Sequence, residues 1–210
     1  SLVASWYDTL LTLNGYHRGI NKFFQRISLP LPDNPKILDV GCGNGWFTNK
    51  LSSLGHSVVG LDVNAHELDQ AARLFGGSRT QFIYGDIFAS NFSESKFDMI
   101  IFNASLQYFP SIPKLIARCF ELLSPKGEIH VLDSPFYEED EIIPAKKRTE
   151  SYFTGIGVPE AAGYYHHHSF SELEWNNCEV LYRPGRLMGL FGSKKSPFQW
   201  KVVCLMPHRV

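Results

Sequence analysis

One stretch of twelve residues, 36–47, constrains the fold of this chain more than any other. An apolar run that contains Asp39 is followed by glycines at three alternate positions, Gly41, Gly43 and Gly45, and then by a helical pattern. This order predicts a buried strand, a tight turn whose bare backbone approaches a ligand, and a helix whose N-terminus points at that ligand. The stretch therefore predicts a ligand site at a strand-to-helix turn.

The spacing of the glycines argues against two common ligands. A dinucleotide-binding turn has a third glycine where its helix and strand pack closely. Counted from Gly41, that place is occupied by Trp46, whose ring cannot replace a glycine. A Walker loop is excluded because no Gly-Lys-Ser or Gly-Lys-Thr triplet follows Gly45. NAD, FAD and Walker-type nucleotide binding are therefore disfavoured.

A second acidic residue supports a different adenosine-containing ligand. Residues 58–62 read Val-Val-Gly-Leu-Asp, a second short strand that ends at Asp62. An acid about 20 residues beyond the glycines is placed to accept hydrogen bonds from a ribose diol. The pattern Asp-x-Gly-x-Gly-x-Gly from Asp39 to Gly45, followed by Asp62, resembles the class I S-adenosylmethionine-dependent methyltransferases, in particular those that act on small molecules.

The apolar runs and helical patterns alternate along the chain, which predicts an α/β fold with a parallel sheet and right-handed crossovers. The resemblance implies a Rossmann-like, seven-stranded, mostly parallel sheet with helices on both faces and a closing antiparallel strand pair. The strands are expected at 36–40, 57–61, 81–84, 97–102, 128–133, 178–182 and 198–205, and the helices at 44–54, 65–75 and 112–123.

The length of 210 residues favours one domain, residues 1–210. Within it we expect an N-terminal helical lid over 1–35 and a cofactor-binding core over 36–133. Residues 134–170 break the rhythm of strands and helices, and a stretch this long is expected to form a lid or a small helical insertion over the acceptor. A short helix from Ser169 and the final strands would complete the fold over 171–210.

Composition narrows the range of partners. With 20 basic and 21 acidic residues the net charge is -1, which gives no electrostatic case for nucleic acid or an anionic membrane surface. No apolar run approaches the roughly 18 residues of a membrane span. The four cysteines lie far apart and favour free thiols in a reducing cytoplasm. We expect a cytoplasmic monomer or homodimer with a small-molecule acceptor as its partner.

The resemblance assigns cofactor roles to the first two motifs. The backbone at the three glycines would lie against the methionine and ribose portion of S-adenosylmethionine. Asp39 would place negative charge beneath this cationic ligand, or would instead cap amides of the loop. Asp62 would accept both ribose hydroxyls, and Val63 would pack on the adenine face.

Further cofactor contacts are implied outside these motifs. The carboxylate of Asp86 would take the adenine amino group and the amide of Ile87 a ring nitrogen, although Asp86 also suits a turn after glycine. Asn103 ends the fourth strand, where a backbone carbonyl would meet the ligand ammonium, or its side chain would only cap the next turn. Arg18 would bind the ligand carboxylate with its guanidinium fork, or would be a solvated residue in a hinge.

Candidate catalytic residues follow the fourth strand and lie in the insertion. His166, His167 and Tyr108 are the candidates for the acceptor site, with a histidine as general base. Each histidine could instead be a hydrogen-bonded loop residue, and Tyr108 could belong to the core. Since side chains of His166, His167 and His168 cannot all reach one atom from a regular strand or helix, no metal site is expected.

The expected reaction is the direct in-line transfer of a methyl group to a small molecule. Residues 103–106 read Asn-Ala-Ser-Leu and not Asn/Asp-Pro-Pro-Tyr, which argues against a nucleic-acid base as acceptor. The alternatives are an inactive cofactor-binding domain that acts as a sensor or interaction module, an enzyme that puts the same cofactor to another use and, last, a nicotinamide oxidoreductase. The methylated atom is left open among oxygen, nitrogen, sulfur and carbon.

Overall fold

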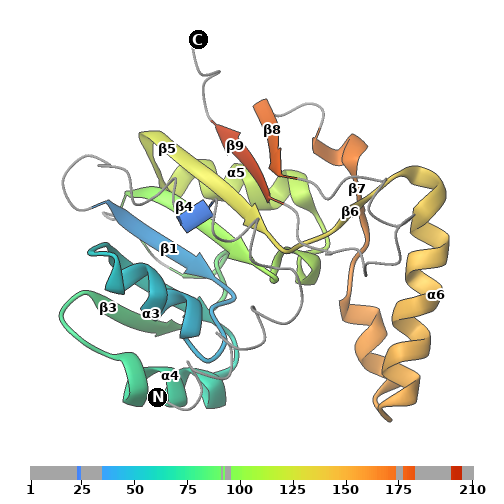
Figure 1. Cartoon of the computed structure of the whole chain (residues 1–210), viewed down its shortest axis with the longest axis horizontal. Coiled ribbons are helices and arrows are strands. Elements are labelled where there is room, and N and C mark those ends of the chain that lie inside the picture. Colours follow the sequence, from blue (N-terminus) through green and yellow to red (C-terminus); the bar gives the residue numbers. More distant parts are fainter. Residues whose placement is uncertain are drawn as a thin grey trace, which may run out of the picture.

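The computed structural model describes residues 23–24, 35–90, 92, 96–173, 177–182 and 200–204. A central sheet has the strand order β3-β2-β1-β4-β5-β9-β8, in which the first five strands run parallel and β9 lies antiparallel to both of its neighbours (Figure 1). The α/β class with a mostly parallel sheet is therefore confirmed. The strands of this sheet are β1 (Lys36–Val40), β2 (Ser57–Asp62), β3 (Thr80–Tyr84), β4 (Phe97–Asn103), β5 (Leu123–Leu132), β8 (Asn177–Tyr182) and β9 (Trp200–Cys204).

Three helices connect the parallel strands, and local sequence signals explain where they begin. Helix α3 (Trp46–Ser53) follows β1, α4 (Ala65–Phe75) follows β2, and α5 (Ile112–Leu122) precedes β5. Asn64 caps α4, because its side chain accepts hydrogen bonds from the backbone amides of the first turn. Ser111 caps α5 in the same way. The expected bounds of α4 are confirmed, whereas α3 begins two residues later than expected because the glycine turn continues to Gly45.

The helices α3 and α5 cover opposite faces of the sheet, as the side chains of β1 show. Leu38 and Val40 pack in one core cluster with the buried side of α5, together with Ile100 and Phe102 of β4. The intervening Asp39 points to the other face, where Thr48 of α3 meets it. Successive residues of a strand point to opposite faces, so α5 covers one face and α3 the other.

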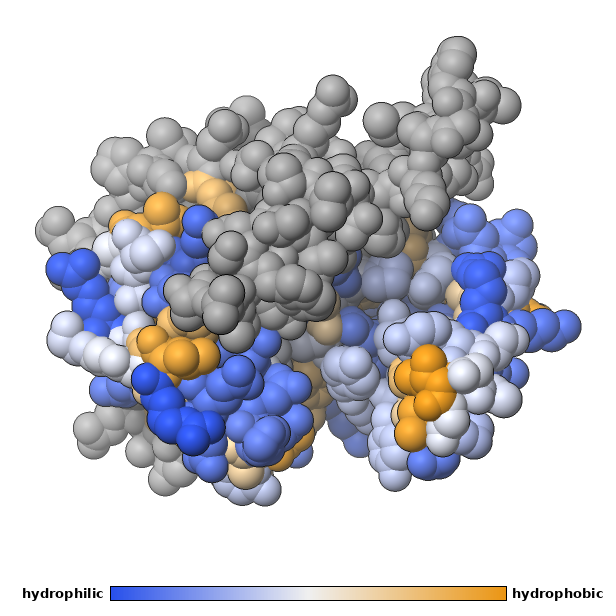
Figure 2. Space-filling view, turned by 60° about the horizontal axis from the view of Figure 1, so that its bottom comes forward, coloured by the Kyte–Doolittle hydropathy of each residue, from blue (hydrophilic) through white to orange (hydrophobic). Residues whose placement is uncertain are grey.

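The insertion forms a separate layer at one end of the sheet. Its strands β6 (Phe136–Tyr137) and β7 (His168–Ser169) pair in parallel, and between them lie α6 (Glu139–Gly155) and the 3-10 helix η2 (Pro159–Tyr164). Figure 1 shows α6 at the side of the molecule away from α3 and α4, and Figure 2 shows the groove that separates the two parts.

The short helix expected from Ser169 is only a 3-10 turn, η3 (Phe170–Leu173). The carboxylate of Glu172 accepts a hydrogen bond from the amide of Ser169 at 2.9 Å, which caps the start of this turn. The expected short helix is therefore present among the described residues as a 3-10 helix.

The described helices were searched for membrane spans. None of them is both long and apolar enough to cross a bilayer.

Cys42, Cys119 and Cys178 are free thiols, and burial raises the pKa of Cys42 and of Cys119, so that neither is a reactive thiolate near neutral pH. Of the expected N-terminal lid only residues 23–24 are described. Phe23 is fully buried and packs against the rings of Phe47 and His130.

Gly45 lies where the turn before α3 packs closely against α4 and β3. Its φ of 76° lies in the left-handed region, and a Cβ atom there would come within 2.7 Å of Ala71 and of the Phe82 ring. This is the close packing that a dinucleotide turn assigns to its third glycine, here one position before Trp46. The ring of Trp46, one position later, therefore does not prevent this close packing at Gly45.

We expect Gly45→Ala to lower the free energy of unfolding by about 2–5 kcal/mol, since it combines a left-handed alanine with overpacking. Gly55→Ala is the matched control, because Gly55 has a φ of 101° but no atom within 4 Å of the added Cβ. Urea denaturation should therefore show a much smaller loss for the control. Equal losses would mean that the packing around Gly45 contributes nothing.

Asp39 is a carboxyl group enclosed between the sheet and α3. It is 1% exposed, and the Thr48 hydroxyl donates a hydrogen bond to its Oδ2 at 2.6 Å. Burial raises the pKa of Asp39 to about 7, the Thr48 hydrogen bond opposes this shift, and the charge of Asp62 adds to it. The group is therefore neutral in the folded protein at pH values where it is ionised in the unfolded chain.

This difference predicts a pH-dependent contribution to stability. Because the folded protein holds the Asp39 proton more tightly, the contribution is fully present below about pH 4 and is lost as the pH rises toward 7, by up to about 4 kcal/mol. Asp39→Asn removes the titration. The stability of the variant relative to the natural chain should therefore rise between pH 4 and pH 7 in parallel denaturation series. A difference that does not change with pH would contradict a raised pKa.

Candidate active site

Two adjoining cavities open at the carboxyl ends of the parallel strands, where ligands bind in open α/β sheets. The larger cavity has a volume of about 690 Å³ and the smaller about 180 Å³. Both border Gly41, Gly43, Glu67 and Ala104, so they are two parts of one site. The larger cavity is also bordered by Asp62, Val63, Asp86, Ile87 and Tyr108, and the smaller by Asp39 and Asn103.

The glycine loop is fixed to the end of β2 by backbone hydrogen bonds. The amides of Gly41 and Cys42 both donate to the carbonyl of Leu61, at 2.8 and 3.2 Å. The amide of Gly43 donates to Asp62 Oδ2 at 2.7 Å. The predicted turn at the end of β1 is therefore confirmed, and Asp62 is part of what holds it.

The need for glycine in this loop arises largely from neighbouring protein atoms. A Cβ at Gly41 would lie 2.5 Å from the Cβ of Ser105, whereas one at Gly43 would meet only the movable carboxylate end of Glu67, at 2.6 Å. Both residues also have positive φ, at 73° and 51°. These contacts add to the expected reason, which was close approach to the ligand alone.

Asp62 is the charged group at the centre of the larger cavity. Its Oδ1 accepts from the amide of Asn64 at 2.8 Å, while its Oδ2 holds Gly43. Each carboxylate oxygen has room for about two hydrogen bonds, so an acceptor position remains on both. The carboxylate is fixed in place and can still bind a pair of hydroxyl groups.

The far end of the larger cavity is formed by the loop after β3. Asp86 is exposed and its Oδ1 accepts from the amide of Phe88 at 2.9 Å, so the alternative role in a turn is present. Its second oxygen is not used in that turn. Of the apolar residues that border the cavity, Ile87 is buried at 1% exposure, whereas Val63 is 65% exposed to solvent.

Arg118 of α5 is a residue that sequence reasoning missed. Its guanidinium donates to the carbonyls of Ile87 at 3.0 Å and Ser90 at 2.9 Å, and it pairs with Glu121 at 2.7 Å. The Arg118 side chain therefore connects α5 to the loop after β3 and fixes the backbone of that loop. No local pattern indicates this, because the residues lie about thirty positions apart in sequence.

The loop after β4 borders both cavities at Ala104. Ala104 follows Asn103 with a left-handed φ of 54°, and its amide donates to the carbonyl of Leu132. The hydroxyl of Ser105 donates to the carbonyl of Val40 at 2.5 Å. Asn103 borders the smaller cavity, as does Asp39, although Asp39 is turned toward Thr48 and away from the larger cavity.

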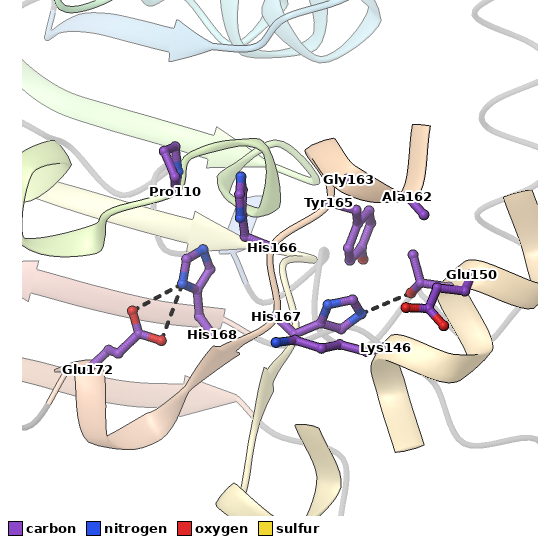
Figure 3. Close-up of a pocket in the computed structure, with 11 residues that line it drawn as sticks. Pro110, Lys146, Glu150, Ala162, Gly163, Tyr165, His166, His167, His168 and Glu172 are labelled. Carbon is purple, nitrogen blue, oxygen red and sulfur yellow. Dashed lines mark hydrogen bonds and ion pairs between the residues drawn. The ribbon is translucent and has the colours of Figure 1, made fainter. Parts of the chain in front are cut away.

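The insertion contains a further cavity of about 350 Å³, which we name the insertion cavity (Figure 3). Figure 3 shows three consecutive histidines around it, with their rings turned in different directions. Their partners differ. His167 Nε2 meets the hydroxyl of Thr149 at 2.9 Å, whereas His168 Nδ1 meets the carboxylate of Glu172 at 3.1 and 3.3 Å. No group of three or more metal-binding side chains occurs in the part of the chain that the structure describes.

The environment of the insertion cavity shifts several pKa values. Burial lowers the pKa of His167 and of His166, and the positive charge of Lys146 lowers both further. Burial also raises the pKa of Tyr165 to about 12, with added effects of Tyr137, Tyr108 and Asp133. The two histidines are therefore largely neutral near pH 7, and Tyr165 keeps its proton.

Three contacts bring the insertion cavity close to the larger cavity. Pro110 borders both. The rings of Tyr108 and Tyr165 meet edge to face, with centroids 6.1 Å apart. The amide of His166 donates to the carbonyl of Gln107 at 2.7 Å. The candidates Tyr108, His166 and His167 therefore lie in one region, whereas Arg18 lies outside the described residues.

Comparisons with known proteins agree with this architecture. Residues 37–127 match the model of a family described as a methyltransferase domain. The chain is 34% identical over 94 residues to a malonyl-[acyl-carrier protein] O-methyltransferase of Erwinia billingiae, a match that covers 45% of this chain and 37% of the relative. It is 33% identical over 97 residues to a ubiquinone biosynthesis O-methyltransferase of Nitrosococcus oceani, with 45% and 41% covered. The matched part therefore spans less than half the length of these relatives.

Solved structures share the fold over a longer part of the chain. The plantazolicin methyltransferase BpumL in complex with SAH covers 96% of this chain and 88% of its own, with a TM-score of 0.62 and 17% identity. A SAM-dependent methyltransferase of Methanosarcina mazei covers 83% of this chain and 93% of its own, with a TM-score of 0.56 and 23% identity. At such identities the likeness shows the fold alone. Residues 37–127 are therefore similar to a methyltransferase domain, and the chain has the fold of solved S-adenosylmethionine-dependent methyltransferases.

Proposed function

We propose that this chain binds S-adenosylmethionine in the two adjoining cavities and transfers its methyl group to a small-molecule acceptor bound at the insertion. The observation that supports this most is the fixed carboxylate of Asp62, which borders the larger cavity and retains an acceptor position on each oxygen. A ribose diol offers two hydroxyl donors at matching spacing. The charge-assisted hydrogen bonds would each contribute about 1.5–3 kcal/mol.

The remaining walls of the larger cavity suit an adenine ring. Val63 and Ile87 both border the cavity and provide apolar surface, and the second oxygen of Asp86 can accept from an exocyclic amino group. Arg118 keeps the loop of Ile87 in place. We therefore assign the adenosine portion of the cofactor to the larger cavity.

The smaller cavity suits the amino-acid end of the cofactor. It is bordered by the backbone of Gly41 and Gly43, by Asn103 and by the buried carboxyl group of Asp39. Backbone carbonyls there would accept from the ligand ammonium. A cation bound beside Asp39 would favour its ionised form, so that the carboxyl group supplies the negative charge only when the ligand is present.

We place the acceptor in the insertion cavity, which is reached from the cofactor site past Tyr108. His166, His167 and Tyr108 are proposed as acceptor-site residues. The Erwinia and Nitrosococcus relatives are O-methyltransferases by name, and BpumL is a plantazolicin methyltransferase, so acceptors differ within the family. The insertion would set the specificity of this chain, because the sheet motifs are used for the cofactor.

The bound cofactor would supply the activated methyl group, and the protein would supply position and a dry environment. Orientation of the reacting atoms alone can contribute about 7–11 kcal/mol. The glycine loop and Asp62 would fix one reactant, and the insertion would fix the other across the wall formed by residues 104–110.

Replacing Asp62 tests the cofactor assignment. We expect Asp62→Asn to weaken S-adenosylmethionine binding roughly 10- to 100-fold in calorimetric titration, because the amide loses the charge and one of two acceptor oxygens. Asp98→Asn is the control with the same chemical change. Asp98 accepts from Lys36 and Ser124 at the opposite edge of the sheet, so its variant should bind the cofactor as the natural chain does. Equal weakening in both variants would place the cofactor elsewhere.

Turnover distinguishes an enzyme from an inactive cofactor-binding domain. The experiment incubates the chain with S-adenosylmethionine and a panel of small hydroxyl, amine, thiol and carboxylate compounds, and measures S-adenosylhomocysteine and methylated product together. The proposal predicts equal amounts of both with at least one acceptor class. Tight cofactor binding with no product from any class would favour the sensor or interaction module.

A further inference from the structure

His168 differs from the other two histidines of the insertion cavity in its burial and in its partner. It is 4% exposed, and its Nδ1 lies 3.1 and 3.3 Å from the two oxygens of Glu172. Its Nε2 is buried and has no hydrogen-bond partner among the described residues. Such an atom is expensive to leave unsatisfied, so it is a place where a ligand would supply the missing partner.

The partner of His168 determines which ring nitrogen bears the proton. An ionised carboxylate can only accept hydrogen bonds, so Nδ1 must be the donor to Glu172. In the neutral ring Nε2 is then unprotonated and is a base. Figure 3 shows that this nitrogen points away from Glu172, toward the side on which His166 lies.

The dyad of His168 and Glu172 is held rigidly. Glu172 Oε1 also accepts from the amide of Ser169 at 2.9 Å, and the ring of Phe136 packs on His168 with centroids 5.9 Å apart. The pairing of β6 with β7 places His168 beside Phe136, four residues beyond the carboxyl end of β5. Both members of the dyad are therefore pre-positioned before any ligand binds.

His167 lies in the same cavity and also has a buried ring nitrogen, Nδ1, without a partner among the described residues, but its tautomer is not fixed. Its partner is the Thr149 hydroxyl, which can donate or accept, so the contact does not fix the position of the ring proton. Its ring packs between Tyr137 and Tyr165, at centroid distances of 5.6 and 5.1 Å. Of the two, His168 is the better-defined base.

We propose that His168 is the general base of the methyl transfer, that Glu172 is its positioning residue, and that the acceptor is therefore a hydroxyl compound such as a phenol. This inference rests on the proposed function. A carboxylate acceptor is already ionised near neutral pH and needs no base, whereas a hydroxyl group does.

The proposed step conserves atoms and charge. The acceptor hydroxyl gives its proton to His168 Nε2 as an oxygen electron pair forms the new O–CH₃ bond. The S–CH₃ bond of the cofactor breaks, and its electron pair stays on sulfur, which becomes a neutral thioether. Glu172 stabilises the imidazolium that results, and the proton then leaves to water. No oxidant or further reactant is needed.

The ring spectrum of the histidines tests the dyad without acceptor or cofactor. Long-range proton–nitrogen spectra are recorded on the ¹⁵N-histidine-labelled chain. The ring signals of His168 are identified because they disappear in His168→Gln, and they should show the Nδ1-protonated tautomer at neutral pH. Glu172→Gln should abolish that preference, because an amide can donate as well as accept. Glu160→Gln, which removes an exposed carboxylate of the same insertion, should leave it unchanged. The opposite tautomer in the natural chain would overturn the dyad.

Turnover then tests the role in catalysis. With substituted phenols and matched benzoic acids as acceptors, His168→Gln should lower kcat on phenols roughly 10²- to 10⁴-fold while cofactor binding stays unchanged. Glu172→Gln should lower it less and Glu160→Gln should not lower it. Undiminished turnover in His168→Gln, or turnover of the acids alone, would overturn the proposal while the methyltransferase function stands. No turnover of any acceptor by the natural chain would contradict the function itself, and the ring spectrum would still decide the dyad.

Discussion

The hydrogen bond from the Gly43 amide to Asp62 is the interaction on which the arrangement of the candidate site depends. It joins the turn after β1 to the end of β2, and through Asn64 the same carboxylate is tied to the start of α4. One charged group therefore sets the position of two loops. A carboxylate that accepts backbone amides is held without the entropy cost of a long side chain, and this makes it a precise ligand-binding group.

The sheet with its helices and the insertion differ in packing. The sheet and its helices enclose a continuous apolar core, against which the cofactor loops are braced by residues such as Arg118 and Ser105. The insertion contributes few buried apolar residues of its own, and its cavity is bordered by histidines, Tyr165 and charged side chains. Under the proposed function, the rigid part would fix the cofactor and the polar insertion would bind the acceptor.

Much of the cofactor half was predictable because its signals are local. The cap at Asn64, the glycine turn and the acids at the ends of β1 and β2 are written in short stretches of sequence, and the structure brings Asp62, Val63, Asp86 and Ile87 together as expected. The contacts that constrain Gly45 and the partner of Asp39 were not predictable, because they arise where α3 and α4 pack on the sheet. The support from Arg118 depends on the same tertiary packing.

The insertion shows where sequence reasoning was too coarse. His166 and His167 were the predicted candidates, and His168 was not among them. The structure shows that His168 is the histidine that meets Glu172 four residues later. The spacing His-x-x-x-Glu was a usable signal. It was weak, because the segment between the two residues is a 3-10 turn and not the regular helix that such a spacing normally indicates.

The central claim is that the two adjoining cavities hold S-adenosylmethionine and not a dinucleotide. Calorimetric titration of the natural chain with S-adenosylmethionine, S-adenosylhomocysteine and NAD tests it most directly. The account predicts micromolar binding of both adenosyl compounds, about -8 kcal/mol, and no binding of NAD. Binding of NAD with no binding of either adenosyl compound would contradict it.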